Sequence, residues 1–377
     1  MYFKEVIGQD SLKEKIIQNI NLGRVSHAQL LLGPEGCGNL VLAIAYARYL
    51  SCKNRQPSDA CGTCTSCIKF NKLSHPDLNF FYPVPARTEG GKSISSKDFG
   101  IQWRSFLTTS RYVGLNDWYR HINIENKQGI IGAEDCNEII KLLSYKSFES
   151  EYKIIIIWMI ERLFHSTAPK LLKTLEEPSD KTLLLLVSEN QDQILNTILS
   201  RTQLLKVSPL SDHQITESLI NNYKCDAQRA RQIAFMSEGN FVKALSVMAN
   251  PEIFQDSMNI MRDWLRACFS FNIPVLIGFV DQLATMGREK QKELLTYGIE
   301  LMRQCIMANY GISDLLKADD EAKEFILKLK NVVTPHPAKL ISEQFSSAIV
   351  AVERNANPKI LFTDLSFKTA QLLRLKK

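Results

Sequence analysis

Four cysteines stand close together early in the chain, at Cys52, Cys61, Cys64 and Cys67. Their spacing, C-x₈-C-x₂-C-x₂-C, puts four soft ligands within sixteen residues, and a C-x₂-C pair lets two sulfurs reach one ion at about 2.3 Å. This set of ligands suits tetrahedral Zn²⁺. Because four protein ligands leave no coordination position for a substrate, the sequence predicts a structural zinc site.

The same cysteines have a second interpretation, a redox-active C-x-x-C pair. That interpretation leaves the additional cysteines at matching spacing without a role, so we favour the metal site. The other five of the nine cysteines are scattered, and we expect them to act as small hydrophobic side chains. They are Cys37, Cys136, Cys225, Cys268 and Cys305.

A glycine-rich turn at residues 33–38 follows a short apolar run and precedes a helical pattern. In a phosphate-binding loop, G-x-x-x-x-G-K-[ST], backbone N–H groups cradle the phosphates, the Lys neutralises them and the hydroxyl binds Mg²⁺. Here Gly33, Gly36 and Gly38 supply the glycines, but Asn39 replaces the Lys and Leu40 replaces the Ser or Thr. The turn predicts a vestigial phosphate loop that cannot organise metal-assisted hydrolysis. A glycine turn that never bound a nucleotide is the alternative.

A second position bears on the same question, because a P-loop enzyme also needs an acidic residue at the end of a buried strand to hold Mg²⁺ and orient water. After the run Ile154–Ile157 these positions are Trp158 and Met159, and neither can ligate a hard cation. We expect Glu161 to be a solvated or capping residue. The loop lacks its Lys and its Ser or Thr, and the strand end lacks its acidic residue. Two separate losses in one catalytic site favour a nucleotide site that has lost its function over coincidence.

Strand and helix patterns alternate around these residues in the first half of the chain. The sequence predicts helices at 10–22, 40–50 and 132–146, and strands at 28–32, 121–124, 153–157, 182–188 and 204–207. A further helix is expected to be capped by Ser166 or Thr167 and to end before Pro178. Residues 83–128 show little pattern, so we expect a loop or a small excursion there.

From residue 211 onward the patterns are helical, short over 211–248 and longer over 251–375, for example at 290–310 and 339–356. The sequence therefore predicts three domains. They are an α/β nucleotide-binding core over 1–208 with an inserted zinc module at 52–67, a small helical lid over 209–250, and an all-α domain over 251–377.

The composition is that of an ordinary globular protein. The 377 residues carry 46 Lys and Arg against 40 Asp and Glu, and 45% are hydrophobic, which excludes wholesale disorder. The N-terminal residues lack the apolar stretch of a signal peptide, and no apolar run approaches the roughly 20 residues that span a bilayer. We expect a cytoplasmic protein without membrane contact. The basic residues form no stripe interleaved with aromatic side chains, so independent high-affinity DNA binding is not expected.

Several motifs together resemble those of the clamp-loader subunits of bacterial DNA polymerase III, which are members of the AAA+ ATPase superfamily. These motifs are Arg24-Val-Ser-His27, the glycine turn that follows it, Leu171-Leu-Lys-Thr-Leu-Glu-Glu-Pro178 and Thr197-Ile-Leu-Ser-Arg201. Within that family, His75-Pro-Asp77 and Asn355-Ala-Asn-Pro358 are similar to motifs of the delta-prime subunits. The resemblance covers nearly the whole chain apart from residues 83–128. It implies an AAA+-like core, a lid and a C-terminal collar domain.

The resemblance also implies a role in a machine that uses ATP to open a ring-shaped sliding clamp and close it around primer-template DNA. The implied partners are the clamp-loader ATPase subunits gamma and tau, the delta subunit, the sliding clamp and the DNA. Delta-prime subunits resemble ATPases that have lost hydrolysis, as the substitutions at Asn39, Leu40, Trp158 and Met159 would require.

Ser200 and Arg201 stand where the family carries its Ser-Arg-Cys motif, with Thr202 in place of the Cys. By the resemblance, Arg201 is expected to act as an arginine finger, which neutralises charge on the γ-phosphate of a neighbouring subunit's ATP. An ordinary surface arginine in a salt bridge is the alternative.

Two other functions stay open at this point. One is an active DNA-dependent ATPase with an atypical P-loop, and the other is a stand-alone zinc-containing nucleic-acid-binding protein.

Overall fold

The computed structural model describes residues 1–87, 93–124, 129–164, 168–176, 181–249, 251–311 and 320–374. The chain divides into two compact units, Met1–Leu245 and Ser246–Lys377. The further division of the first unit at residue 208, which the sequence predicts, stays a prediction. Predictions on Ser166, Thr167 and Pro178 lie outside the described residues.

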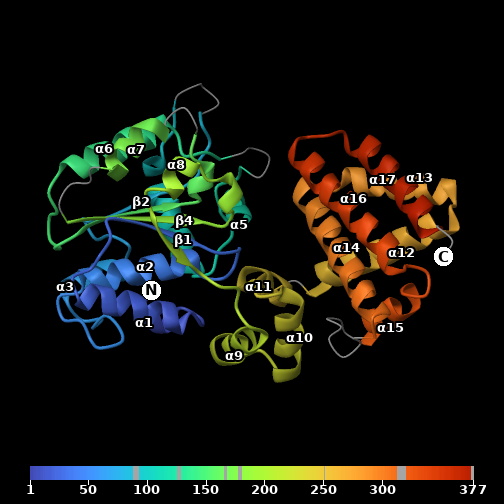
Figure 1. Ribbon diagram of the computed structural model, residues 1–377, viewed down its shortest axis with the longest axis horizontal. Helices are drawn as coiled ribbons and strands as arrows, with labels where there is room; N and C mark the ends of the chain where they lie inside the picture. The colour runs from blue at the N-terminus through green and yellow to red at the C-terminus, as the bar shows by residue number, and fades with distance from the viewer. Residues whose placement is uncertain are drawn as a thin grey trace. The chain divides into compact units, whose positions relative to one another are not determined.

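The first unit is built on a five-stranded sheet whose neighbouring strands are all parallel, in the order β2-β3-β4-β1-β5 (Figure 1). The strands are β1 (Ala28–Leu32), β2 (Leu78–Phe81), β3 (Lys153–Trp158), β4 (Thr182–Ser188) and β5 (Gln203–Lys206). The helices are α1 (Asp10–Asn21), α2 (Asn39–Ser51), α3 (Thr65–Asn71), α4 (Gly100–Thr109), α5 (Leu115–His121), α6 (Ala133–Ser144), α7 (Ala168–Glu176), α8 (Asn196–Leu199), α9 (Asp212–Tyr223), α10 (Ala227–Ser237) and α11 (Phe241–Ala249). Short 3₁₀ turns lie at η1 (Phe3–Glu5), η2 (Ser96–Phe99), η3 (Ile160–Arg162) and η4 (Gln191–Gln193).

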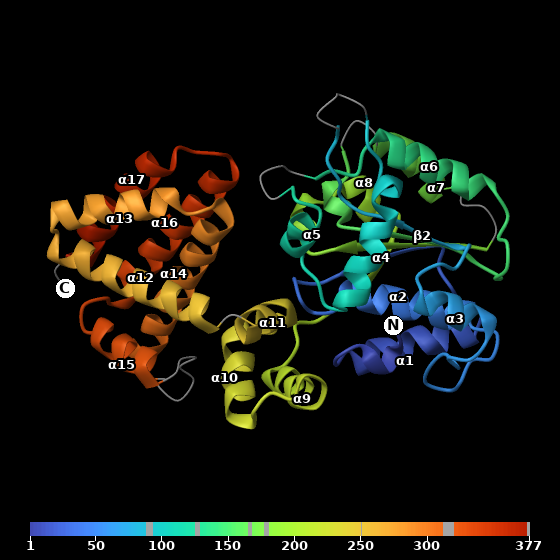
Figure 2. The ribbon, with the colours of Figure 1, turned by 180° about the vertical axis from the view of Figure 1, so that it is seen from behind.

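Helices cover both faces of this sheet, with α6, α7 and α8 on one side and α1, α2 and α3 on the other (Figures 1 and 2). On the first side, Ile155 and Leu184 belong to the same buried cluster as Ile139 of α6 and Leu171 of α7. On the second side, every residue of α2 is buried, as expected for a helix that is apolar all round. The glycine-rich turn therefore joins β1, which is buried apart from the half-buried Leu32, to a fully buried helix.

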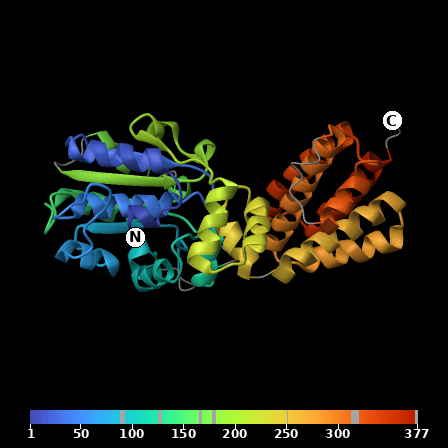
Figure 3. The same ribbon diagram turned by 90° about the horizontal axis from the view of Figure 1, so that it is seen from below.

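The second unit contains only helices in its described residues, which confirms the helical C-terminal region (Figure 3). They are α12 (Pro251–Ser270), α13 (Ile273–Thr285), α14 (Arg288–Asn309), α15 (Asp320–Leu329), α16 (Pro335–Glu353) and α17 (Pro358–Leu373). Its core includes Trp264 of α12, Met302 of α14 and Phe345 of α16. Gly298 lets α14 and α16 approach closely, since a Cβ there would lie 2.5 Å from the Phe345 ring.

One predicted strand is wrong. Residues 121–124 form the end of α5 and a turn, and Ile122 N–H donates to the Trp118 carbonyl in a helical pattern. Polar and apolar residues alternate in His-Ile-Asn-Ile because Ile122 and Ile124 are buried in the turn at the end of α5, and the alternation does not reflect a strand. The fifth strand is instead β2, which pairs with β3 in register Leu78 to Ile154.

The patternless stretch 83–128 is helical rather than a plain loop in its described residues, since it carries η2, α4 and α5. Its tryptophans are fully buried: Trp103 stacks on Tyr82 with ring centroids 3.9 Å apart, and Trp118 meets Trp103 edge-on at 5.1 Å. The insertion is thus packed onto the sheet by aromatic contacts. Among the described residues, no helix is both long and apolar enough to cross a bilayer.

The buried Asp77 joins the start of β2 to the segment that leads into β3. Its carboxylate accepts hydrogen bonds from three consecutive backbone N–H groups, those of Phe148 at 2.5 Å, Glu149 at 2.7 Å and Ser150 at 2.8 Å. Burial alone would raise the pKa of this carboxyl group, but the three N–H donors favour the charged form and hold the pKa below its usual value. In this fold the His75-Pro-Asp77 motif is structural.

We expect Asp77→Asn to lower the free energy of unfolding by about 1–3 kcal/mol at neutral pH, because the amide NH₂ would face N–H donors and leave them unpaired. A carboxylate whose folded pKa is lowered stabilises the fold above its unfolded pKa of about 3.9, and that contribution is lost as the pH falls through the folded pKa. The difference between the wild type and the variant should therefore shrink below about pH 4. Thermal unfolding of both proteins between pH 7 and pH 3 measures it, and equal stability at pH 7 would contradict the assignment.

Candidate functional site

The glycine-rich turn lies between β1 and α2, where a phosphate loop belongs. Gly36 and Gly38 adopt left-handed backbone angles, with φ of 74° and 95°, which side chains other than glycine's rarely tolerate. Gly33 is required by close approach, since a Cβ there would lie 2.2 Å from the Val207 carbonyl oxygen. The turn therefore has glycines at the positions where its backbone requires them.

Asn39 uses its amide to close the loop from within. Its Nδ2 donates to the carbonyl oxygens of Gly33 at 2.7 Å and Ser188 at 3.1 Å, and its Oδ1 accepts from the Cys37 thiol at 2.8 Å. The side chain is 6% exposed. The position that would carry a phosphate-binding Lys thus ties the end of β1 to the end of β4.

Tyr112, from the insertion, fills the space in front of the loop. Its ring lies so close to Gly38 that a Cβ on the glycine would be 3.1 Å away, and its hydroxyl accepts a hydrogen bond from Ile7 N–H at 2.7 Å. The ring also packs edge-on against Phe241 of α11, with centroids 4.9 Å apart. What is left is a cavity of about 20 Å³, enough for a single water molecule.

This cavity collects the residues that the sequence assigned to the vestigial loop. Its lining includes Gly36, Gly38, Asn39 and Leu40, and also Trp158 from the end of β3. Trp158 is 2% exposed and lies 5.3 Å from the Trp103 ring. The strand end that would hold Mg²⁺ is therefore part of an aromatic core.

Two carboxyl groups, those of Glu161 and Glu189, follow the ends of β3 and β4. Of the two roles expected for Glu161, solvated or capping, its contacts agree with the second: Oε1 accepts a hydrogen bond from the backbone N–H of Glu189 at 3.0 Å, and this links the ends of β3 and β4. Burial raises the pKa of both carboxyl groups, and for Glu189 the nearby Glu35 and Glu161 raise it further. Glu189 lines the cavity, so this raised pKa belongs to a carboxyl group beside the closed loop.

The start of α11 lies against the same loop. Phe241 N–H donates to the Gly36 carbonyl at 3.2 Å, and Asn240 Nδ2 donates to Glu35 Oε2 at 3.0 Å. Val242 completes the lining of the cavity. The loop is thus kept closed by contacts from Asn39 at the start of α2, from Tyr112 in the insertion and from the start of α11.

We expect Asn39→Ala to lower the free energy of unfolding by about 1–3 kcal/mol, because the Gly33 carbonyl loses its side-chain donor and the Ser188 carbonyl keeps only the weaker one from Gly33 N–H. Asn221→Ala, at an exposed position of α9, is the matched control and should change stability by no more than about 0.5 kcal/mol. Thermal unfolding of the full chain compares the two. An Asn39→Ala variant as stable as the control would show that these hydrogen bonds do not hold the loop.

Arg201 lies just beyond α8, and the cavity lining does not include it. Its Nε lies 2.5 Å from Glu176 Oε1, while Nη1 donates to the Thr197 carbonyl at 3.0 Å and to Ser200 Oγ at 3.2 Å. About a third of the side chain, 34%, is still exposed. The guanidinium is therefore held at the surface with an open side.

Glu176 is the last residue of α7 and belongs to the Leu171–Pro178 motif. Its ion pair with Arg201 brings together two motifs that are 25 residues apart. Spacing and residue type alone predict no role for Glu176, although its place in the Leu171–Pro178 motif is a signal. Tyr112 had no comparable signal, because it lies in the stretch without a pattern.

The four cysteines form a separate cluster. Their sulfur atoms all lie within 4.8 Å of one another; Cys52 and Cys61 Sγ are 3.5 Å apart, and Cys61 and Cys67 Sγ 4.0 Å. Four sulfurs placed tetrahedrally at about 2.3 Å from one ion are separated by about 3.8 Å, so the arrangement fits. The cluster could hold a metal ion.

Backbone N–H groups surround these sulfurs. Cys61 N–H donates to Cys52 Sγ at 3.3 Å, Cys64 N–H to Cys61 Sγ at 3.4 Å, and Cys67 N–H to Cys64 Sγ at 3.5 Å. The N–H groups of Cys64 and Thr63 lower the pKa of the Cys61 thiol to about 6, whereas burial raises that of Cys67 to about 12. Such donors stabilise thiolates, the form that binds metals.

The fold defines a protein with a parallel α/β core, a glycine-rich loop after β1, and a second unit that is all-α in its described residues. Residues 8–211 match the family described as DNA polymerase III, delta subunit, which is more than half of the chain. The chain belongs to this family and is a delta-prime-like clamp-loader protein.

Individual relatives agree with this family. The chain is 22% identical over 368 residues to the DNA polymerase III subunit delta' of Escherichia coli, covering 96% of this chain and 94% of that protein. It is 25% identical over 252 residues to the subunit gamma of Buchnera aphidicola, covering 66% of this chain but only 58% of the gamma subunit. A solved gamma subunit-related protein of Thermotoga maritima is 14% identical with a TM-score of 0.41, covering 96% of this chain and 100% of that one.

Proposed function

We propose that the chain is a subunit of the DNA polymerase III clamp loader that does not hydrolyse ATP. It braces the ATPase subunits and supplies Arg201 in trans to a neighbour's ATP while the sliding clamp is loaded onto primed DNA. Gamma or tau subunits and a delta subunit are its protein partners. The clamp and the primer-template DNA are reached through the complex, and the all-α unit contributes to a shared collar.

The closed phosphate loop is the observation that carries this proposal. A nucleotide site needs some hundreds of Å³, and the space in front of this loop is about 20 Å³. The loop offers no cation for the phosphates at position 39, and the strand end offers Trp158 in place of a Mg²⁺ ligand. A chain with this loop does not hydrolyse ATP itself and can contribute to hydrolysis only at the nucleotide site of a partner subunit.

Arg201 supports the second half of the proposal. Glu176, Thr197 and Ser200 restrict its guanidinium to one orientation, which reduces the entropy lost when the side chain meets a phosphate. Nε and Nη2 contact Glu176 and both N–H groups of Nη1 are used, so one N–H on Nη2 is left on the open side for a ligand from another subunit. The salt bridge to Glu176 is thus compatible with the finger, because the pair holds the arginine without burying it.

We expect Arg201→Ala to leave the fold and the assembly unchanged and to slow hydrolysis at the neighbouring ATP site by about 10³- to 10⁵-fold, with clamp loading reduced accordingly. Arg120→Ala is the matched control, because Arg120 is also exposed and also has a carboxylate nearby, 3.8 Å away on Asp117. Single-turnover ATPase and clamp-loading assays on the reconstituted complex measure both variants. Wild-type rates with Arg201→Ala, in a complex of normal composition, would refute the finger.

We further propose that Cys52, Cys61, Cys64 and Cys67 hold one structural Zn²⁺. The ion would fix the loop between α2 and α3, since Cys52 directly follows α2 and Cys64 caps α3. The fit of the sulfur distances and the N–H donors around the sulfurs support this proposal.

Purified protein should contain one zinc per chain, and Cys61→Ser should lose it together with part of the thermal stability. Cys225→Ser, at a cysteine outside the cluster, is the control and should retain the metal. Elemental analysis after dialysis measures the content. Well under one zinc per wild-type chain would remove the metal from the proposal without touching Arg201.

The two alternative functions are separated by assays on the isolated chain. An active DNA-dependent ATPase would turn over Mg-ATP well above background, and the closed loop argues against it. A stand-alone zinc-containing nucleic-acid-binding protein would bind DNA tightly at physiological salt.

A further inference from the structure

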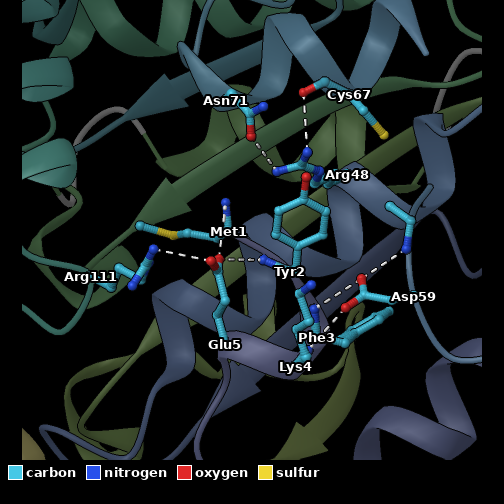
Figure 4. Close-up of polar contacts among 11 residues, drawn as sticks. Met1, Tyr2, Phe3, Lys4, Glu5, Arg48, Asp59, Cys67, Asn71 and Arg111 are labelled. Atoms are coloured by element: carbon cyan, nitrogen blue, oxygen red, sulfur yellow. Dashed lines mark hydrogen bonds and ion pairs between the residues drawn. The ribbon is translucent and has the colours of Figure 1, made fainter. Parts of the chain in front are cut away.

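Arg48 is a fully buried cation beside the four cysteines. It lies on α2, four residues before Cys52, and its side chain is 0% exposed. Nη2 donates to the carbonyl oxygen of Cys67 at 3.2 Å, while Nε is buried without a hydrogen-bond partner. Figure 4 shows it pointing toward Cys67 and Asn71, with the ring of Tyr2 against it.

The other partners of Arg48 are uncharged. Nη1 donates to Asn71 Oδ1 at 2.8 Å, and the Tyr2 ring covers the guanidinium, with its centroid 3.4 Å from the Arg48 Cζ atom. In the part of the chain that the structure describes, Arg48 forms no ion pair with a carboxylate. A buried cation without a counter-charge is strongly destabilising, so a negative group is required nearby.

The cysteine cluster can supply that group. Four thiolates around one divalent ion have a net charge of −2, and the attraction between this charge and a guanidinium is strong where water is excluded. We propose that Arg48 is the counter-cation of the four-cysteine centre and that its positive charge slows release of the metal. This inference rests on the zinc site proposed above.

The N-terminal segment excludes water from this contact. Asp59, which lies between Cys52 and Cys61 in the sequence, accepts hydrogen bonds from the backbone N–H groups of Phe3 at 3.2 Å and Lys4 at 3.0 Å (Figure 4). Gly62 makes room for Tyr2, because a Cβ there would lie 2.7 Å from the Tyr2 hydroxyl. The loop that carries the cysteines thus also holds the aromatic ring that covers Arg48.

Zinc release to a chromogenic chelator, measured on the full chain, tests the role of the charge. Arg48→Met keeps the volume but removes the charge, and we expect release to become about 10- to 100-fold faster, as for other groups that contact metal ligands. Arg55→Met is the matched control: it removes a charge from the same loop, but Arg55 donates to the carbonyls of Tyr49 at 3.1 Å and Leu50 at 2.6 Å. Its release rate should stay within about twofold of the wild type.

Arg48→Lys and Arg48→Gln separate charge from packing and replace the first variant if it does not fold. Lysine keeps the charge and should release zinc more slowly than glutamine, by about tenfold. The role of Arg48 is overturned if the Lys and Gln variants release zinc at the same rate. It is also overturned if Arg48→Met releases zinc as slowly as the wild type. Both outcomes leave the zinc site intact. A wild-type chain that holds no zinc overturns both proposals, so the two failures are distinguishable.

Discussion

The closed form of the loop after β1 depends on the hydrogen bonds of the Asn39 side-chain amide, which points into the protein. A lysine at this position would extend toward the phosphates of a bound nucleotide, because a cation is poorly accommodated among carbonyl groups in the protein interior. The amide instead satisfies two of those carbonyls, on Gly33 and Ser188. Once that side chain is turned inward, the loop is a brace between two strands.

The insertion at residues 83–128 closes the same loop from the front. It brings Tyr112 to the front of the loop and Trp103 to the end of β3, so that aromatic surface occupies the space that charged groups and solvent fill in a working nucleotide site. Hydrophobic burial therefore stabilises the region that in an ATPase must stay open and hydrated. The proposed arginine finger is in the opposite kind of place, because Arg201 is partly exposed and pairs with Glu176.

Much of the core could be predicted from the sequence. Long β-branched and leucine runs specify β3 and β4, and the glycine spacing specifies the loop, because both are local signals. The strand predicted at 121–124 is wrong and the helices of the insertion were not predicted, since Trp118 is buried by contact with Tyr82, which is distant in the sequence. The pairing of Arg201 with Glu176 and the contact of Arg48 with the cysteine loop depend on tertiary structure in the same way, and no spacing rule reveals them.

The positions of the four tryptophans let their intrinsic fluorescence report on the two units separately. Trp103, Trp118 and Trp158 are neighbours at 5.1–5.3 Å beside the closed loop, close enough for excitation energy to pass among their indoles, whereas Trp264 is alone in the core of the second unit. Fluorescence of the intact chain accordingly combines a coupled signal from the loop region with an independent one from the helical unit. Loosening of the phenol ring that covers the loop would alter the first without the second.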